Sequence, residues 1–466
     1  MNRHYQARRR FLKRSLACAI AGSGAGAMSG KLSLVGSALA DSSNFAGTND
    51  YKALVCVFLY GGSDSFNLFV PSDSARYAEY SSARGSLALD QSQLLPASDG
   101  IVSFNGNLPG IRQLYEDGNA AIVANAGNLI QPVTRSSLLN GSASIPADLF
   151  AHNHQQEQWQ KGLASQPTSV VGAGWGGRMA DLLRDANAGS TLPPSFTVAG
   201  SNYFQSGNQT SPISINAKSG AKLLDYLDAN SYSSNAGRDA AMSQILALQN
   251  DHILKQFAGE SFGRARDSSR LLASVMNQHG PSSLDFNTEN SNLGEQLQMV
   301  ARLIAGREIM GQKRQIYFVG MGGWDTHDAQ SPRLEQLTAD LDKGLSSFQQ
   351  ELAALGVADA VTTFTASDFG RTLTVNGDGS DHGWGGHYLV MGGAVNGRKL
   401  VGDWPSYAIG GNDDTGDKGR VIPSMSVNQY GAALASWMGL SNSDIAGIFP
   451  DLSNFDDSWI NYGLFT

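Results

Sequence analysis

The chain has 466 residues, with 33 Lys and Arg against 41 Asp and Glu, so its formal net charge at pH 7 is −8. The first forty residues hold seven of the basic residues and none of the acidic ones, and the rest of the chain therefore carries −15. A surface this acidic argues against nucleic acid or an anionic membrane as a partner.

Residues 1–40 are predicted to be a twin-arginine export signal rather than part of the fold. Arg8, Arg9 and Arg10 precede a weakly apolar stretch rich in Gly and Ala, and Ala38-Leu39-Ala40 fits a small-x-small cleavage site. Gly, Ser and Lys31 interrupt the stretch, so we expect no integral membrane anchor. The mature protein is expected in the periplasm or outside the cell, with residues 41–466 as a single domain.

The first strand of the mature chain is predicted at residues 52–60, a continuous apolar run typical of a strand buried on both faces. Gly61 and Gly62 allow a sharp exit from this strand, and Asp64 and Asn67 follow. These two residues either offer oxygen atoms to a ligand or form an Asx-turn that caps a helix. A helix at 108–118 and a strand at 120–127 complete a β–α–β unit, which favours a parallel sheet.

The middle of the chain is predicted to be mainly helical. A helix begins near residue 151 and stops at Gly162; because His152 and His154 are two residues apart, at most one of them faces a site. Residues 217–310 have helical periodicity and are predicted to form an insertion beside the sheet.

Ionisable residues gather after two further predicted strands, at 315–321 and 361–366. Asp325 and His327 follow the first of these strands, across Gly322 and Gly323. After the second strand, five ionisable residues fall within twenty positions together with Gly370. They are Asp368, Arg371, Asp381, His382 and His387. Ligands bind at the carboxyl ends of strands in open α/β sheets, so this density predicts a metal or catalytic site. The alternative is a solvated loop with capping carboxylates.

These motifs together resemble an exported bacterial family called domain of unknown function 1501 (DUF1501), which is grouped with the alkaline-phosphatase-like superfamily of sulfatases and phosphoglycerate mutases. The resemblance rests on the segments around Asp64, Asp325, Asp368 and His382, and on Gly402-Asp403-Trp404-Pro405. It implies a mainly parallel sheet sandwiched by helices. It also implies two divalent metal ions, Zn, Mn or Mg, that hold a phosphate or sulfate ester.

Carried over residue by residue, the resemblance implies metal ligands from carboxylates and imidazoles, which suit these metals. The implied ligands are Asp64, Asp325, His327, Asp368 and His382, with His152 and Arg371 as catalytic residues. Arg371 would hold the anion by a bidentate contact. Phe369 stands where the superfamily often has a second imidazole.

The nucleophile expected from the resemblance is absent. Ala151 precedes His152 where many family members have Ser, and Ala has no nucleophilic atom. Thr134, Ser136 or Ser137, or a water activated by metal, could replace it; otherwise the site binds without turnover. The sequence therefore predicts an exported metal-dependent hydrolase-like protein acting on a small anionic ester or a glycan. The alternatives are a non-catalytic envelope protein that uses the same pocket, and a structural remnant without metal.

Overall fold

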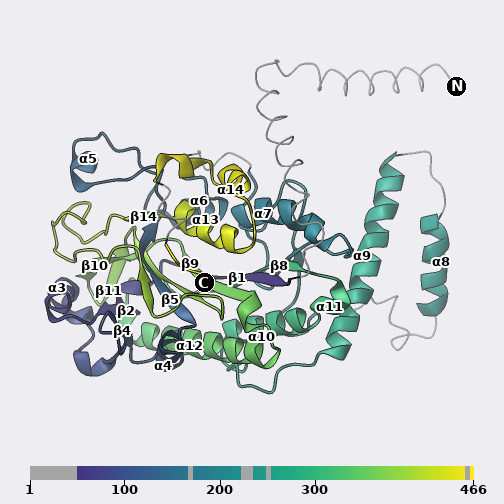
Figure 1. The fold of residues 1–466 in the computed structure, drawn as a ribbon, viewed down its shortest axis with the longest axis horizontal. Helices are drawn as coiled ribbons and strands as arrows, with labels where there is room; N and C mark the ends of the chain where they lie inside the picture. Colours follow the sequence, from purple (N-terminus) through teal and green to yellow (C-terminus); the bar gives the residue numbers. More distant parts are fainter. Residues whose placement is uncertain (1–49, 166–171, 222–234, 248–252, 457–461, 466) are drawn as a thin grey trace, which may run out of the picture. The chain divides into compact units, whose positions relative to one another are not determined.

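The computed structural model describes residues 50–165, 172–221, 235–247, 253–456 and 462–465, and the predicted export signal lies outside them. A sheet forms the centre of this part of the chain (Figure 1). It has nine strands, in the order β13-β5-β12-β9-β1-β8-β6-β7, with β14 also paired to β5. Its strands are β1 (Lys52–Leu59), β5 (Ala120–Gly127), β6 (Ser195–Thr197), β7 (Ile213–Ser214), β8 (Arg314–Met321), β9 (Val361–Ser367), β12 (Gly386–Met391), β13 (Lys399–Val401) and β14 (Met425–Ser426).

This sheet is mostly parallel. Strand β1 pairs in parallel with β8 and β9, whereas β12 runs antiparallel to both β5 and β9. The fold class predicted from sequence, a mainly parallel sheet flanked by helices, is confirmed. The four strands predicted at 52–60, 120–127, 315–321 and 361–366 correspond to β1, β5, β8 and β9.

Helices cover both faces of the sheet (Figure 1). The helices of the described residues are α3 (Ser74–Arg84), α4 (Pro109–Glu116), α5 (Arg135–Leu139), α6 (His152–Lys161), α7 (Trp175–Leu183), α8 (Asn235–Ala247), α9 (Ile253–Gln278), α10 (Asn292–Ala305), α11 (Arg307–Met310), α12 (Gln330–Ala354), α13 (Val427–Trp437) and α14 (Asn442–Ile448). Within the described residues, no helix combines the length and the apolar character needed to cross a membrane. Helices α8 to α11 make up most of the described residues of 217–310, and their assignment as an insertion stays a prediction.

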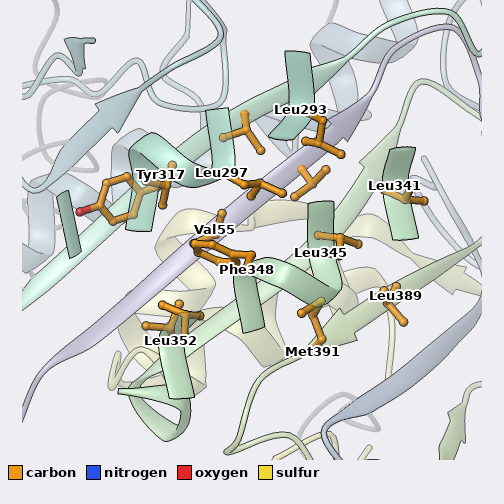
Figure 2. Close-up of a cluster of buried hydrophobic side chains, with 14 of the residues drawn as sticks. Val55, Leu293, Leu297, Tyr317, Leu341, Leu345, Phe348, Leu352, Leu389 and Met391 are labelled. Carbon is orange, nitrogen blue, oxygen red and sulfur yellow. The ribbon is translucent and has the colours of Figure 1, made fainter. Parts of the chain in front are cut away.

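Helix α12 packs an apolar stripe against one face of the sheet. Leu341, Leu345, Phe348 and Leu352 recur at intervals of three and four, so they share one side of the helix. Figure 2 shows them with Val55 of β1 and with leucines of α10, and all of these side chains are buried. The stripe fixes α12, and with it the loop between β8 and α12, against the sheet.

The opposite face is packed with aromatic rings. Phe364 of β9 lies between Trp159 of α6, Trp175 of α7 and Tyr430 of α13, with ring centroids 5.6–6.2 Å apart. Buried rings contribute large apolar areas and fix side-chain geometry. The amino end of α6, which carries His152, is thereby anchored at the carboxyl end of β9.

Two smaller sheets were not expected from the sequence. Strands β2 (Phe69–Pro71), β4 (Val102–Asn105) and β3 (Leu94–Pro96) form one of them. Strands β10 (Arg371–Asn376) and β11 (Gly379–His382) form a hairpin in which Arg371 lies opposite His382. The hairpin occupies a stretch that sequence periodicity left without a strand.

Candidate metal centre

Three residues that are far apart in sequence converge at the carboxyl edge of the sheet. His152 is the first residue of α6, Asp325 follows β8, and His382 ends β11. One ligand atom from each lies within 4.8 Å of the other two. Two imidazole nitrogens and a carboxylate oxygen are a ligand set that suits zinc and related divalent metals.

The loops after β1 and β8 meet because glycine stands between them. These strands are paired in register, with Leu59 opposite Met321, so both end at the same edge. Gly61 has φ +117°, and a Cβ atom there would lie 2.4 Å from the amide nitrogen of Asp325. Only glycine allows both this conformation and this close approach.

His152 is oriented by a carboxylate behind it. Its Nδ1 lies 2.6 Å from Oδ2 of the buried Asp368, which also accepts a hydrogen bond from Gln156 at 2.8 Å. The hydrogen bond to Asp368 is the main reason why the pKa of His152 is raised. Nε2 of His152 points toward Asp325, 3.4 Å away, and has no hydrogen-bond partner among the described residues.

His382 is oriented in the same way by a backbone carbonyl. Its Nδ1 lies 2.7 Å from the carbonyl oxygen of Phe150, and its Nε2 lies 3.3 Å from Oδ1 of Asp325. Burial lowers the pKa of His382, which favours the neutral ring. A neutral ring that donates from Nδ1 presents a lone pair at Nε2, the arrangement found in metal-binding histidines.

The ring of Phe369 packs against both imidazoles, with centroids 4.9 Å from His152 and 4.6 Å from His382. The family resemblance implies that Phe369 stands in place of a second imidazole. In the structure it supplies apolar support for the two rings.

His327 stands at the edge of this group. Its Nε2 lies 3.0 Å from Oδ1 of Asp325 and 2.9 Å from Nε2 of His382, and its Nδ1 lies 3.5 Å from Asp381. The side chain is 43% exposed, so it is free to adjust its position. Two ring nitrogens this close attract each other only when a proton or a cation lies between them.

Arg371 holds Asp325 from inside the protein. It is fully buried, and Nη1 donates to Asp325 at 2.7 Å while Nε and Nη2 donate to Ser380. Burial by itself raises the pKa of Asp325, but the hydrogen bond and charge of Arg371 bring it below the ordinary value. The carboxylate therefore stays ionised, and an anion would reach Arg371 only by displacing these contacts.

Asp64 lies in a separate buried network. Its Oδ2 accepts hydrogen bonds from Arg84 and from Gln330, while its Oδ1 has no partner among the described residues. Burial raises the pKa of Asp64 although Arg84 and Arg371 oppose the shift. Asp64 is outside the three-residue group, and its role as a metal ligand stays a prediction. Sequence reasoning missed Arg84 and Gln330, since neither stands in a recognisable motif.

Other candidate residues have structural partners. His387 is buried: its Nδ1 accepts from the backbone N–H of Asn125 at 3.1 Å, and its Nε2 lies 3.0 Å from the hydroxyl of Tyr407. His154 pairs with Asp148 at 2.6 Å. Thr134 and Ser137 form a reciprocal cap at the start of α5.

The mostly parallel sheet and the histidine–carboxylate group at its carboxyl edge define an α/β protein with a candidate metal site. The family model described as "Protein of unknown function (DUF1501)" matches residues 51–415, and the chain belongs to this family. Among curated proteins, none matches the chain.

Solved structures with similarity to this chain include Ps i-CgsB, crystallised in complex with k-i-k-neocarrahexaose. It is 10% identical, with a TM-score of 0.36, and the match covers 89% of this chain and 77% of that one. The PsFucS1 sulfatase from Pseudoalteromonas sp. is 7% identical, with a TM-score of 0.35 and coverage of 88% and 71%. Wild-type alkaline phosphatase PafA is 11% identical, with a TM-score of 0.30 and coverage of 70% and 64%.

Proposed function

We propose that this protein is an exported metal-dependent hydrolase that acts on phosphate or sulfate esters. The observation that carries the proposal is the shared orientation of His152 and His382. In each ring Nδ1 faces a fixed acceptor, and Nε2 faces the ionised Asp325. The sequence resemblance to the alkaline-phosphatase-like superfamily supports the choice of ester.

His152, Asp325 and His382 would hold a divalent metal ion, and His327, 3.0 Å from Asp325, would be a fourth ligand. Nε2 of His152 fits this assignment, because it lies 3.4 Å from Asp325 and forms no hydrogen bond among the described residues, and a buried nitrogen in this situation is costly unless a cation or a proton meets it. A bound metal ion polarises an ester oxygen and lowers the pKa of water.

The chain's own residues would prepare this centre. Asp368 fixes the ring and tautomer of His152, and we propose that Arg371 positions Asp325 rather than contacting the substrate. Phe369 excludes water from one side of both imidazoles. Since α6 begins after Ala151, no hydroxyl of that residue can form a covalent intermediate, and direct attack by water is the favoured route.

A non-catalytic envelope protein is the second candidate, and Ala151 is the observation that favours it. Such a protein would bind metal and ligand in the same place without turnover.

Elemental analysis of the purified protein after reconstitution with Zn, Mn or Mg, followed by assays with aryl phosphate and aryl sulfate esters, separates these functions. Stoichiometric metal with turnover supports the hydrolase, and metal without turnover supports the binding protein. The variant Asp325→Asn should lose the metal, whereas Asp328→Asn, which alters an exposed carboxylate of the same loop, should keep it. Failure to bind any of the three metals would refute both functions.

A further inference from the structure

Arg420 packs directly behind the candidate centre. Its Nε donates to the carbonyl oxygen of His382 at 3.0 Å, and its Cζ lies 4.0 Å from the ring centroid of Phe150. Phe150 in turn accepts the hydrogen bond from Nδ1 of His382. The guanidinium is therefore held in one orientation beside two residues that shape the centre.

The charge of Arg420 is not neutralised within the described part of the chain. The half-buried side chain forms no ion pair there, and neither Nη nitrogen donates a hydrogen bond. The two fully buried arginines near the centre differ in this respect, because Arg84 pairs with Asp64 and Arg371 pairs with Asp325. Arginine donors fixed in place without a carboxylate suit a carboxylate, phosphate or sulfate from outside.

The backbone of the loop that carries Arg420 is also fixed by hydrogen bonds. The same loop carries a second cationic side chain, Lys418. Asp414 is buried and accepts the N–H groups of Gly419 at 3.0 Å and of Arg420 at 3.2 Å. The carbonyl oxygen of Lys418 accepts from Thr374 of β10 at 2.9 Å, so this loop runs along the hairpin that ends in His382. Lys418 is exposed and has no ion-pair partner among the described residues.

The ring of His382 separates Arg420 from the metal position. Nε2 of this ring faces Asp325, whereas Arg420 contacts the backbone carbonyl of the same residue. We propose that Arg420, assisted by Lys418, binds a second anionic group of the substrate, beyond the esterified one. This inference rests on the proposed function, and it narrows the substrate class to esters with a further carboxylate, sulfate or phosphate.

The test uses ligands that differ only in the second group: 4-carboxyphenyl phosphate and 4-carbamoylphenyl phosphate, together with the corresponding sulfates. Calorimetry on the metal-loaded full chain measures the ratio of their dissociation constants where the esters are not hydrolysed, and the ratio of their kcat/KM values gives the same comparison where they are. The wild type should bind a carboxylate about tenfold more tightly than its matching amide, because one charge-assisted contact distinguishes them. In Arg420→Gln the ratio should fall to about one, with metal content unchanged.

Three variants serve as controls. Arg420→Lys should keep part of the preference, because the charge remains while the fork of donors is lost. Lys418→Gln should reduce it less than Arg420→Gln, because an exposed lysine is well screened. Arg264→Gln, in an exposed part of α9, should leave it intact.

A wild type that binds none of these esters, or binds the acid and the amide equally, overturns the subsite. A preference for the carboxylate over the amide that survives in Arg420→Gln also overturns the subsite. Bound metal and an intact preference without any hydrolysis would refute the proposed hydrolase and leave the subsite standing.

Discussion

The two imidazoles of the candidate centre are oriented by acceptors on their far sides. Asp368 acts on His152, and the carbonyl of Phe150 acts on His382. Of these two acceptors, only Asp368 can be changed by mutation without altering the backbone. It is therefore the residue at which the proposed orientation of the ligands is most directly tested.

The substitution Asp368→Asn should weaken metal binding by about 10- to 100-fold, the usual loss when a carboxylate behind a histidine ligand is removed. A neutral amide oxygen stabilises a ring that donates from Nδ1 less than a carboxylate does. Metal titration with a competing chelator gives the affinity. Unchanged occupancy would show that His152 does not bind the metal through Nε2. Asp328→Asn serves as the matched control, since Asp328 is 71% exposed.

At the scale of elements, the centre depends on how closely the loops after β1 and β8 approach each other. Gly61 allows the approach through its positive φ and its missing Cβ. Asp325 is thus placed by a contact between two loops, and the hairpin β10–β11 then places Arg371 and His382 next to it.

The substitution Gly61→Ala should lower the free energy of unfolding by about 1–3 kcal/mol or more, from backbone strain and from the clash with Asp325. It should also impair metal binding. Gly118→Ala is the matched control: φ is +80° there, but no atom lies within 4 Å of the added Cβ. Gly118→Ala should lower the free energy of unfolding only through backbone strain, and it should leave the metal bound. Chemical denaturation and metal analysis of both variants measure the two effects. Equal losses in the two variants would contradict the close-approach argument.

At the scale of the whole molecule, the buried His387 links stability to pH. Burial lowers its pKa from 6.5 to about 3, so the folded protein keeps the ring neutral while the unfolded chain protonates it below pH 6.5. This contribution to stability is complete above pH 6.5 and is lost as the pH falls toward 3.

The free energy of unfolding should therefore decrease by up to about 1.4 kcal/mol per pH unit from this group over that range. Other groups titrate in the same range, so the measurement is a comparison of slopes. In His387→Gln, denaturation curves between pH 6.5 and 4 should show a shallower decrease than in the wild type. Parallel slopes would mean that His387 takes up its proton without unfolding.

Much of the fold followed from the sequence. Continuous apolar runs predicted β1, β5, β8 and β9. In a strand that is buried on both faces, polar residues do not alternate with apolar ones. The helix predicted at 108–118 corresponds to α4. The hairpin β10–β11 was missed. Its residues Arg371 and His382 contact Asp325 and are polar, so the segment lacks the apolar pattern of a core strand.

The sequence by itself determined which residue types gather at the strand ends, and it placed His152, Asp325, His327 and His382 among the candidates. Only the tertiary structure decided which partners the candidate side chains have. It set Asp368 behind His152, buried Arg371 against Asp325, paired Asp64 with Arg84, and left Arg420 without a counter-ion among the described residues. The physical reason is that a side chain's role depends on which partners reach it, and those partners lie up to hundreds of residues away in the sequence.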